Sequence, residues 1–159
     1  MSTKTDVATP SQREITVTRR FAATRDRVFD AFTRPELVRR WMHGPSGWRL
    51  ETCEIDRQAG GAIRYEWKND AGESMGMSGA FREVDAPART VHTELFDEDW
   101  TGGETVVTTE FHDDGDGTIV TITTRFVSRE ARDAALATGM ADGMEQSFKE
   151  LDAALAAES

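Results

Sequence analysis

Apolar and charged residues alternate with a helical period across residues 128–157. The apolar ones recur at steps of three and four, at Met140, Met144, Phe148, Leu151 and Leu155. Because this spacing gathers them on one face, the sequence predicts a long amphipathic C-terminal helix with Ser128 at its N-cap. Gly139 and Gly143 lie one turn apart in this range, and each costs about 1 kcal/mol relative to alanine in a helix interior. We therefore expect either a close backbone approach at these glycines or a break in the helix near Thr138.

The chain before this helix carries mainly strand signals. Alternating apolar and polar residues predict a half-buried strand over residues 15–21. Thr24 can cap a short helix that ends before Pro35, and Pro35 itself can begin a second short helix that runs to Met42. Six further strands, each bounded by turn residues, are predicted at residues 48–56, 61–69, 75–84, 89–97, 104–113 and 117–127.

This order of elements indicates the α+β class. Sequential hairpins favour an antiparallel sheet in meander order, and one long helix laid across its concave face covers it. The predicted order is β-α-α-β-β-β-β-β-β-α, with seven strands. Residues 1–13 are rich in Ser, Thr and charge and show no period, so we expect a disordered N-terminal tail before a single domain of residues 14–159.

Composition narrows the range of partners. The formal net charge is -10 and the pI is near 4.8, which argues against binding to nucleic acid or to an acidic membrane surface. No apolar run reaches the length of a membrane span, and the N-terminus lacks the apolar segment of a signal peptide, so we expect a cytoplasmic protein. Cys53, the single cysteine, has the same strand parity as Ile55, which favours a buried and inert thiol.

The sequence predicts no metal site and no cofactor. His43, His92 and His112 are far apart and lack the spacing of metal ligands. The acidic turn at residues 114–117 has Arg125 where a calcium-binding loop needs a glutamate. We find no phosphate-binding loop, nucleophile elbow or dinucleotide fingerprint in the sequence.

Five stretches carry a family resemblance when they are taken together. They are RRWMHGP (residues 39–45), EIDRQAGGAIRYEW (54–67), GAFREVDAPARTVHTELFD (79–97), DGDGTIVTITTRF (114–126) and ARDAALATGMADGMEQSFKELDAAL (131–155). Their order and spacing resemble the START-like, or helix-grip, superfamily, in the branch named for homologues of the activator of the heat-shock protein 90 ATPase.

The resemblance implies a strongly curved antiparallel sheet that grips the C-terminal helix, with a cavity between them. Two features depart from the branch. His92 stands where an aromatic residue is common, which makes the wall more polar. We also expect no additional chaperone-engaging domain, such as the co-chaperone members carry, within these 159 residues.

Four tryptophans and six methionines are more than a core of this size usually contains. Hairpin pairing can bring such side chains together from neighbouring strands, as for Tyr65 and Trp67 beside Met77 and Phe81. For any one residue we prefer a packed core, but for the whole set, with the implied grip geometry, we expect a ligand cavity. The candidate ligand-binding residues are Trp41, Trp48, Tyr65, Trp67, Met77, Phe81, His92, Glu94, Phe96, Phe111, Met140, Met144 and Phe148.

His92, Glu94 and Phe96 share one face of a predicted strand. If this face is concave, as the resemblance implies, His92 and Glu94 are polar groups in an apolar chamber that could orient a ligand or act as acid and base. With the opposite parity, Val91, Thr93 and Leu95 point inward and the pair lies in water. Both orientations stay open, so no catalytic residue is predicted.

Three functions stay open at this point. The first is a binding module, without catalytic activity, that holds a small apolar or amphipathic molecule between sheet and helix. The second is an enzyme of the cyclase, dehydratase or hydrolase kind found among START-like proteins, with Glu94 and His92 as acid and base. The third is a chaperone-associated stress protein, which only the family name suggests. A small hydrophobic molecule is the expected partner, and assembly as a homodimer is an open alternative.

Overall fold

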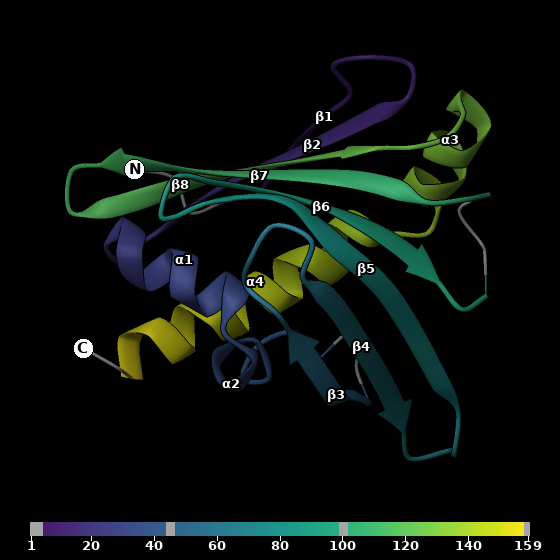
Figure 1. Cartoon of the computed structure of the whole chain (residues 1–159), viewed down its shortest axis with the longest axis horizontal. Coiled ribbons are helices and arrows are strands. Elements are labelled where there is room, and N and C mark those ends of the chain that lie inside the picture. The colour runs from purple at the N-terminus through teal and green to yellow at the C-terminus, as the bar shows by residue number, and fades with distance from the viewer. Residues whose placement is uncertain (1–4, 44–46, 99–101, 158–159) are drawn as a thin grey trace.

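A curved antiparallel sheet surrounds a C-terminal helix in the computed structural model, which describes residues 5–43, 47–98 and 102–157 (Figure 1). The helices of these residues are α1 (Arg25–Thr33), α2 (Pro35–Val38), α3 (Arg129–Ala137) and α4 (Met140–Ala157). The strands are β1 (Asp6–Ala8), β2 (Glu14–Phe21), β3 (Trp48–Ile55), β4 (Ala62–Asn69), β5 (Ser74–Asp85), β6 (Arg89–Phe96), β7 (Thr105–Asp114) and β8 (Gly117–Arg125). Across the sheet their order is β1-β2-β8-β7-β6-β5-β4-β3. The predicted α+β class and helix-grip architecture are confirmed.

The strand β1 differs from the prediction of seven strands and a disordered tail over residues 1–13. Residues 1–4 lie outside the described residues, but Asp6–Ala8 pairs antiparallel with residues 16–18 of β2. The described part of the chain therefore forms an eight-stranded sheet. All side chains of β1 are exposed, so its pairing depends on backbone hydrogen bonds and leaves no alternation in the sequence.

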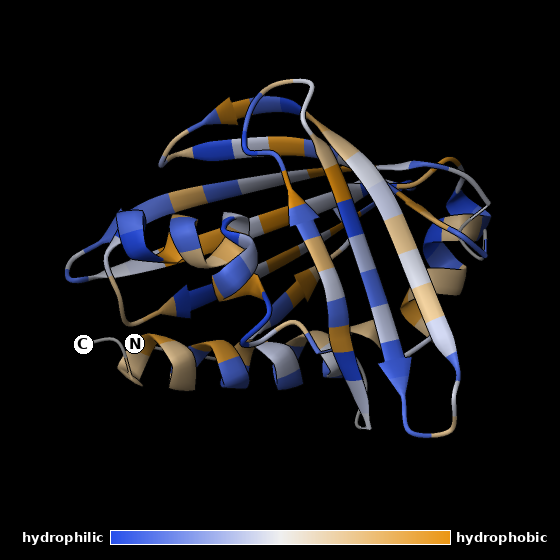
Figure 2. Cartoon of the chain, turned by 60° about the horizontal axis from the view of Figure 1, so that its bottom comes forward, coloured by the Kyte–Doolittle hydropathy of each residue, from blue (hydrophilic) through white to orange (hydrophobic). Residues whose placement is uncertain are grey.

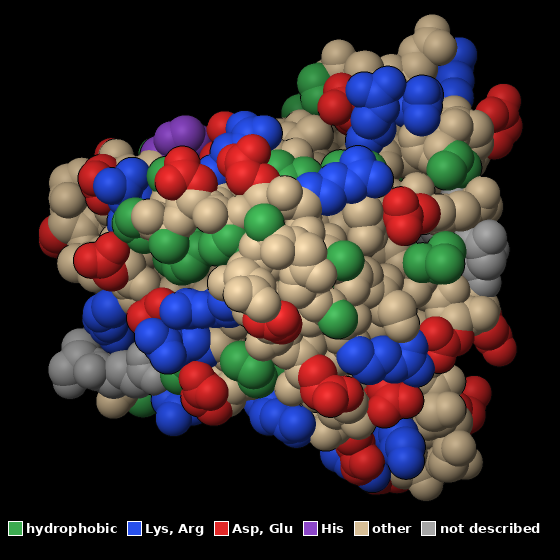
Figure 3. Space-filling view, viewed as in Figure 1, with side chains coloured by type: hydrophobic (Ala, Val, Ile, Leu, Met, Phe, Trp, Pro, Cys, Tyr) green, Lys and Arg blue, Asp and Glu red, His purple; other side chains and the backbone are tan. Residues whose placement is uncertain are grey.

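Alternation along the strands gives the sheet an apolar and a polar face. In β2, Ile15 and Val17 are buried and Thr16 between them is half-buried. Figure 2 shows the same alternation as successive hydrophobic and hydrophilic bands along the strands. Ion pairs join exposed side chains of the sheet. In one of them, Arg64 donates hydrogen bonds to both carboxylate oxygens of Asp97, and these bonds lower the pKa of the Asp97 carboxyl. On the face drawn in Figure 3, acidic and basic side chains are interspersed.

Two irregularities in the strand pairing distort the sheet. The register shifts between Leu50 and Thr52 of β3 and between Phe81 and Glu83 of β5. Bulges of this kind bend a strand and increase its local twist. Gly79 of β5 allows a close approach to β6, because a Cβ atom there would meet the backbone carbonyl of Thr93.

The C-terminal helix is broken, which is one of the two alternatives that its glycines raised. Thr138 is the C-cap of α3, Gly139 has a φ of +78°, and α4 begins at Met140. Glycine adopts such a φ without the steric penalty of a side chain, so the chain changes direction here. The other alternative, a close approach of another backbone segment, is wrong for Gly143, because a Cβ atom built there meets nothing within 4 Å.

Of the two predicted N-caps, Ser128 makes a capping hydrogen bond through its side chain and Thr24 does not. The hydroxyl oxygen of Ser128 accepts a hydrogen bond from the N–H of Ala131 at 3.1 Å, which confirms it as the N-cap of α3. Thr24 occupies the N-cap position of α1, but its side chain makes no capping hydrogen bond. The start of α1 is therefore held by tertiary packing rather than by its cap.

Two apolar clusters lie on the concave side of the sheet. The larger cluster packs α1 and α4 against β2, β7 and β8, and Phe21 and Phe148 are buried in it. The smaller cluster packs α2 against β3, β4 and β5, and Val38 is buried in it. Met42 and Val84 contact both clusters. The two clusters meet along the concave face, beside α4.

Candidate ligand-binding cavity

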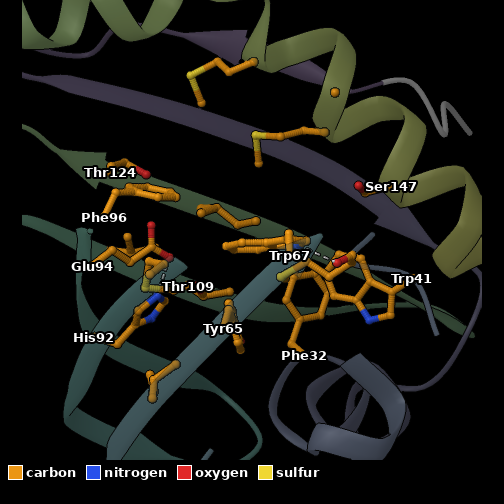
Figure 4. Close-up of a pocket in the computed structure, with 18 of the residues that line it drawn as sticks. Phe32, Trp41, Tyr65, Trp67, His92, Glu94, Phe96, Thr109, Thr124 and Ser147 are labelled. Atoms are coloured by element: carbon orange, nitrogen blue, oxygen red, sulfur yellow. Dashed lines mark hydrogen bonds and ion pairs between the residues drawn. The ribbon is translucent and has the colours of Figure 1, made fainter. Parts of the chain in front are cut away.

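A cavity of about 590 Å³ lies between the concave face of the sheet and α4 (Figure 4). Residues of both apolar clusters form its wall. Its volume is within the ~300–1,000 Å³ range of pockets that enclose small organic molecules. The candidate residues that line it are Trp41, Tyr65, Trp67, Met77, Phe81, His92, Glu94, Phe96, Met140, Met144 and Phe148.

Tryptophan rings offer carbon surfaces to the cavity, because their N–H groups are bound to the backbone. The indole N–H of Trp41 donates to the carbonyl of Ala31 at 2.9 Å, and that of Trp67 donates to the carbonyl of Met42 at 3.0 Å. The ring of Phe32 lies beside Trp41, with 4.9 Å between the centroids. From these two described tryptophans an occupant therefore meets aromatic faces and edges rather than a free indole donor.

Trp48 and Phe111 were predicted to bind a ligand, but they do not line the cavity. Trp48 is half-buried against the smaller cluster at the start of β3. Phe111 is enclosed in the larger cluster, with its ring 5.1 Å from Phe29 and 5.5 Å from Phe32. Its strand parity is the same as that of Thr109, which does line the cavity, but α1 packs against β7 and covers Phe111. Parity alone does not show how far along a strand a cavity extends.

Sequence reasoning missed further residues of the wall. Those with a hydroxyl group are Thr33, Thr90, Thr109, Thr124, Thr138 and Ser147. Those without one are Phe32, Met42, Ile63, Met75, Val107, Ile122, Gly139 and Gly143. Strand register is the signal for some of them: Val107 of β7 lies opposite both His92 of β6 and Thr124 of β8, so all three share one face.

His92 and Glu94 face the cavity, which decides between the two parities left open by the sequence. Nε2 of His92 lies 2.9 Å from Oε2 of Glu94, and 17% and 26% of the two side chains are exposed. Because a carboxylate can only accept hydrogen bonds, His92 is the donor in this pair. Leu95, on the opposite face of β6, is exposed. The pair is thus a polar contact in a wall whose other described residues carry no charged side chain.

Burial changes the acidity of two groups that lie opposite each other on β3 and β4. Removal from water raises the pKa of the Tyr65 phenol well above its usual range, with smaller effects from Cys53 and Glu94. The same cause raises the pKa of the Cys53 thiol to about 11. Both groups are neutral at physiological pH. The buried position predicted for Cys53 is confirmed, and its inertness stays a prediction.

The cavity meets the surface at the junction of α3 and α4. Thr138, Gly139 and Gly143 are the exposed residues of its described lining. Two of these three are glycines, so no side chain from them narrows the opening. The break in the helix and the second glycine therefore coincide with the mouth of the cavity.

The described wall is poor in charge. Glu94 is its one acidic residue, and none of its residues is Lys or Arg. Among residues 5–43, 47–98 and 102–157, no group of three or more His, Cys, Asp or Glu side chains is placed to hold a metal ion. In the same residues, no helix is long and apolar enough to span a membrane.

Known proteins share both the sequence pattern and this architecture. Residues 22–156 match the family model described as Activator of Hsp90 ATPase homolog 1-like protein. A Rhodobacter sphaeroides protein of known crystal structure is 34% identical, with a TM-score of 0.92, and the match covers 97% of this chain and 99% of that one. A solution structure from Arthrobacter aurescens is 26% identical, with a TM-score of 0.81 and coverage of 95% and 91%.

An AHSA1-like protein from Aeromonas hydrophila shares the fold alone, at 20% identity and a TM-score of 0.72, with coverage of 89% of this chain and 93% of that one. A comparison with curated proteins gave no match.

Proposed function

The chain belongs to the family of Activator of Hsp90 ATPase homolog 1-like proteins, in the START-like superfamily, and we propose that it binds a small apolar or amphipathic molecule between its sheet and α4. The observation that carries this proposal is the cavity of about 590 Å³. Protein interiors are close-packed and hold few voids larger than a water molecule. A chamber of this size inside a small domain is therefore typical of a binding site rather than of a packing defect.

The wall provides the driving force for such binding. Each Å² of apolar surface removed from water contributes about 25 cal/mol, and aromatic rings bury large areas. Met77, Met140 and Met144 add flexible thioether side chains that can follow the shape of different occupants. This composition favours an apolar ring system or chain over a strongly polar molecule.

Methyl NMR tests the proposal without a known ligand. The protein is labelled on its methionine and leucine methyl groups and titrated with pyrene as a neutral apolar probe. We expect saturable shifts at Met77, Met140 and Met144, because an aromatic ring in the cavity perturbs nearby methyl resonances. Leu95, exposed on the other face of β6, is the internal control and should not move. Absence of shifts at all three methionines, or an equal shift at Leu95, contradicts the proposal.

Catalysis in the same cavity is a second candidate function, favoured by the 2.9 Å contact between His92 and Glu94. In this candidate the carboxylate orients the imidazole, and the second imidazole nitrogen accepts a proton from water as the water oxygen attacks the carbonyl carbon of an ester. The bond between the acyl carbon and the alcohol oxygen then breaks, and the imidazolium returns the proton to the leaving alcohol oxygen. Naphthyl acetate, an apolar ester, tests it. Turnover that is lost in Glu94→Gln supports the enzyme. If the parent hydrolyses the ester no faster than the variant, or no faster than buffer alone, catalysis by His92 and Glu94 is excluded.

A further inference from the structure

We infer that the molecule held in the cavity carries a hydrogen-bond donor, a hydroxyl or amino group, on an apolar ring system, and that it is not an anion. This inference rests on the proposed binding function and names the class of ligand. Two features of the wall carry it: the position of His92 and Glu94, and the absence of basic residues from its described part.

His92 and Glu94 lie at one end of the cavity, together with the hydroxyl group of Thr124. His92 lies opposite Val107 in the pairing of β6 with β7, and Val107 lies opposite Thr124 in the pairing of β7 with β8. Glu94 lies two residues from His92 on the same face of β6. Figure 4 shows His92, Glu94 and Thr124 on one side of the cavity and Trp41 on the other. An elongated occupant that reaches both ends therefore meets the His92–Glu94 pair at one end and the ring of Trp41 at the other, where Ser147 also lies.

Glu94 presents an acceptor to this polar end. Its Oε2 takes part in the contact with His92, whereas no hydrogen bond from a described residue reaches its Oε1. When His92 donates from Nε2 as a neutral ring, its Nδ1 is a second acceptor, and no described residue donates to that atom either. When an occupant displaces water from these two acceptors, a donor in its place stabilises them. A hydroxyl or amino group on the occupant provides one.

An acidic ligand finds no positive charge in the same place. No Lys or Arg lies in the described wall. Arg57 contacts the lining residue Thr33, but its guanidinium is already paired with Asp30 at 2.9 Å. A carboxylate or phosphate at the polar end would lie near Glu94 without compensation, and like charges in a poorly solvated site repel strongly. The wall thus selects neutral or cationic donors.

Three pyrene derivatives with different head groups test the inference on the unmodified protein: pyrenemethanol, pyrenemethylamine and pyrenecarboxylic acid. Fluorescence titration at neutral pH gives the three Kd values. We expect the alcohol and the amine to bind at least about tenfold more tightly than the acid, as a gained hydrogen bond to a charged group predicts. Equal binding of all three, or tightest binding of the acid, overturns the inference and leaves the binding function intact. If none of the three binds, the proposed function fails with it.

Two variants then locate the source of the preference. Glu94→Gln removes the negative charge and keeps the side-chain shape. The ratio between the Kd of the acid and the Kd of the alcohol should therefore fall by about tenfold. Glu130→Gln makes the same change of net charge at an exposed position on α3 and should leave the preference unchanged. A preference that survives Glu94→Gln, or that changes equally in both variants, contradicts the assigned role of Glu94.

Discussion

Arg19 of β2 holds Asp152 of α4 through two hydrogen bonds of 2.7 Å. The arginine side chain is 2% exposed and the aspartate 40%. The guanidinium also lies 4.8 Å from the centre of the Phe21 ring, and its Nε makes no hydrogen bond within the described part of the chain. This pair fixes α4 to the sheet on the C-terminal side of Phe148, while the mouth of the cavity lies near the other end of the helix.

Removal of Asp152 should therefore destabilise the fold markedly. Asp152→Ala leaves a buried guanidinium without its partner, and breaking a fully buried pair costs about 3–5 kcal/mol. Because water can reach the half-exposed side of Asp152, we expect a loss of about 2 kcal/mol in urea unfolding. Asp142→Ala, at an exposed position on α4, is the matched control and should stay within about 0.5 kcal/mol of the parent. Equal effects of the two changes would show that the pair does not anchor the helix.

Gly79 and Gly143 should respond to alanine in opposite directions. At Gly143 the new methyl group meets nothing within 4 Å, so Gly143→Ala should raise the free energy of unfolding by about 0.5–1 kcal/mol through helix propensity. At Gly79 the methyl group would meet the carbonyl of Thr93, so Gly79→Ala should lower it by about 1–3 kcal/mol. Chemical denaturation of both variants measures the two effects. A destabilising Gly143→Ala would mean that the mouth of the cavity is packed rather than open.

The thiol of Cys53 should react slowly in the folded protein. Burial raises the pKa of the Cys53 thiol to about 11, so little thiolate is present at about pH 8. A colorimetric disulfide reagent should label it only after urea unfolds the chain. The folded state favours the neutral thiol, so its contribution to stability is complete below the usual pKa of about 8.5 and is lost as the pH rises toward about 11. Fast labelling of the folded protein at about pH 8, without urea, would show that the thiol is accessible.

Much of the fold is predictable from the sequence because burial leaves a period in it. Ile15 and Val17 alternate with Thr16 along β2, and Phe148 repeats with Leu151 along α4, so the pattern identifies both elements. The strand β1 leaves no such pattern, because its side chains are exposed and only its backbone is paired.

The cavity is less predictable, because its extent depends on what covers each strand. The position of Phe111 under α1 and the inward side of His92 follow from packing and register, which the composition of a single strand does not contain. Thr109 and Thr124 have hydroxyl groups, so a search for aromatic and thioether residues passes over them although they share the face of Val107.

The binding of Nile red to the parent, Met144→Trp and Gln146→Trp tests most directly whether the cavity is an open binding site. Met144 lines the cavity, whereas Gln146 is exposed on α4 outside the lining and is the size-matched control. A ring placed in open space gains apolar contacts, so Met144→Trp should keep or raise the melting temperature. The same ring occupies part of the site, so it should weaken Nile red binding by about tenfold, or about 1.4 kcal/mol. Gln146→Trp should leave the affinity unchanged. A parent that takes up no dye, or a Met144→Trp variant destabilised by the ~1–3 kcal/mol typical of overpacking, would contradict an open cavity.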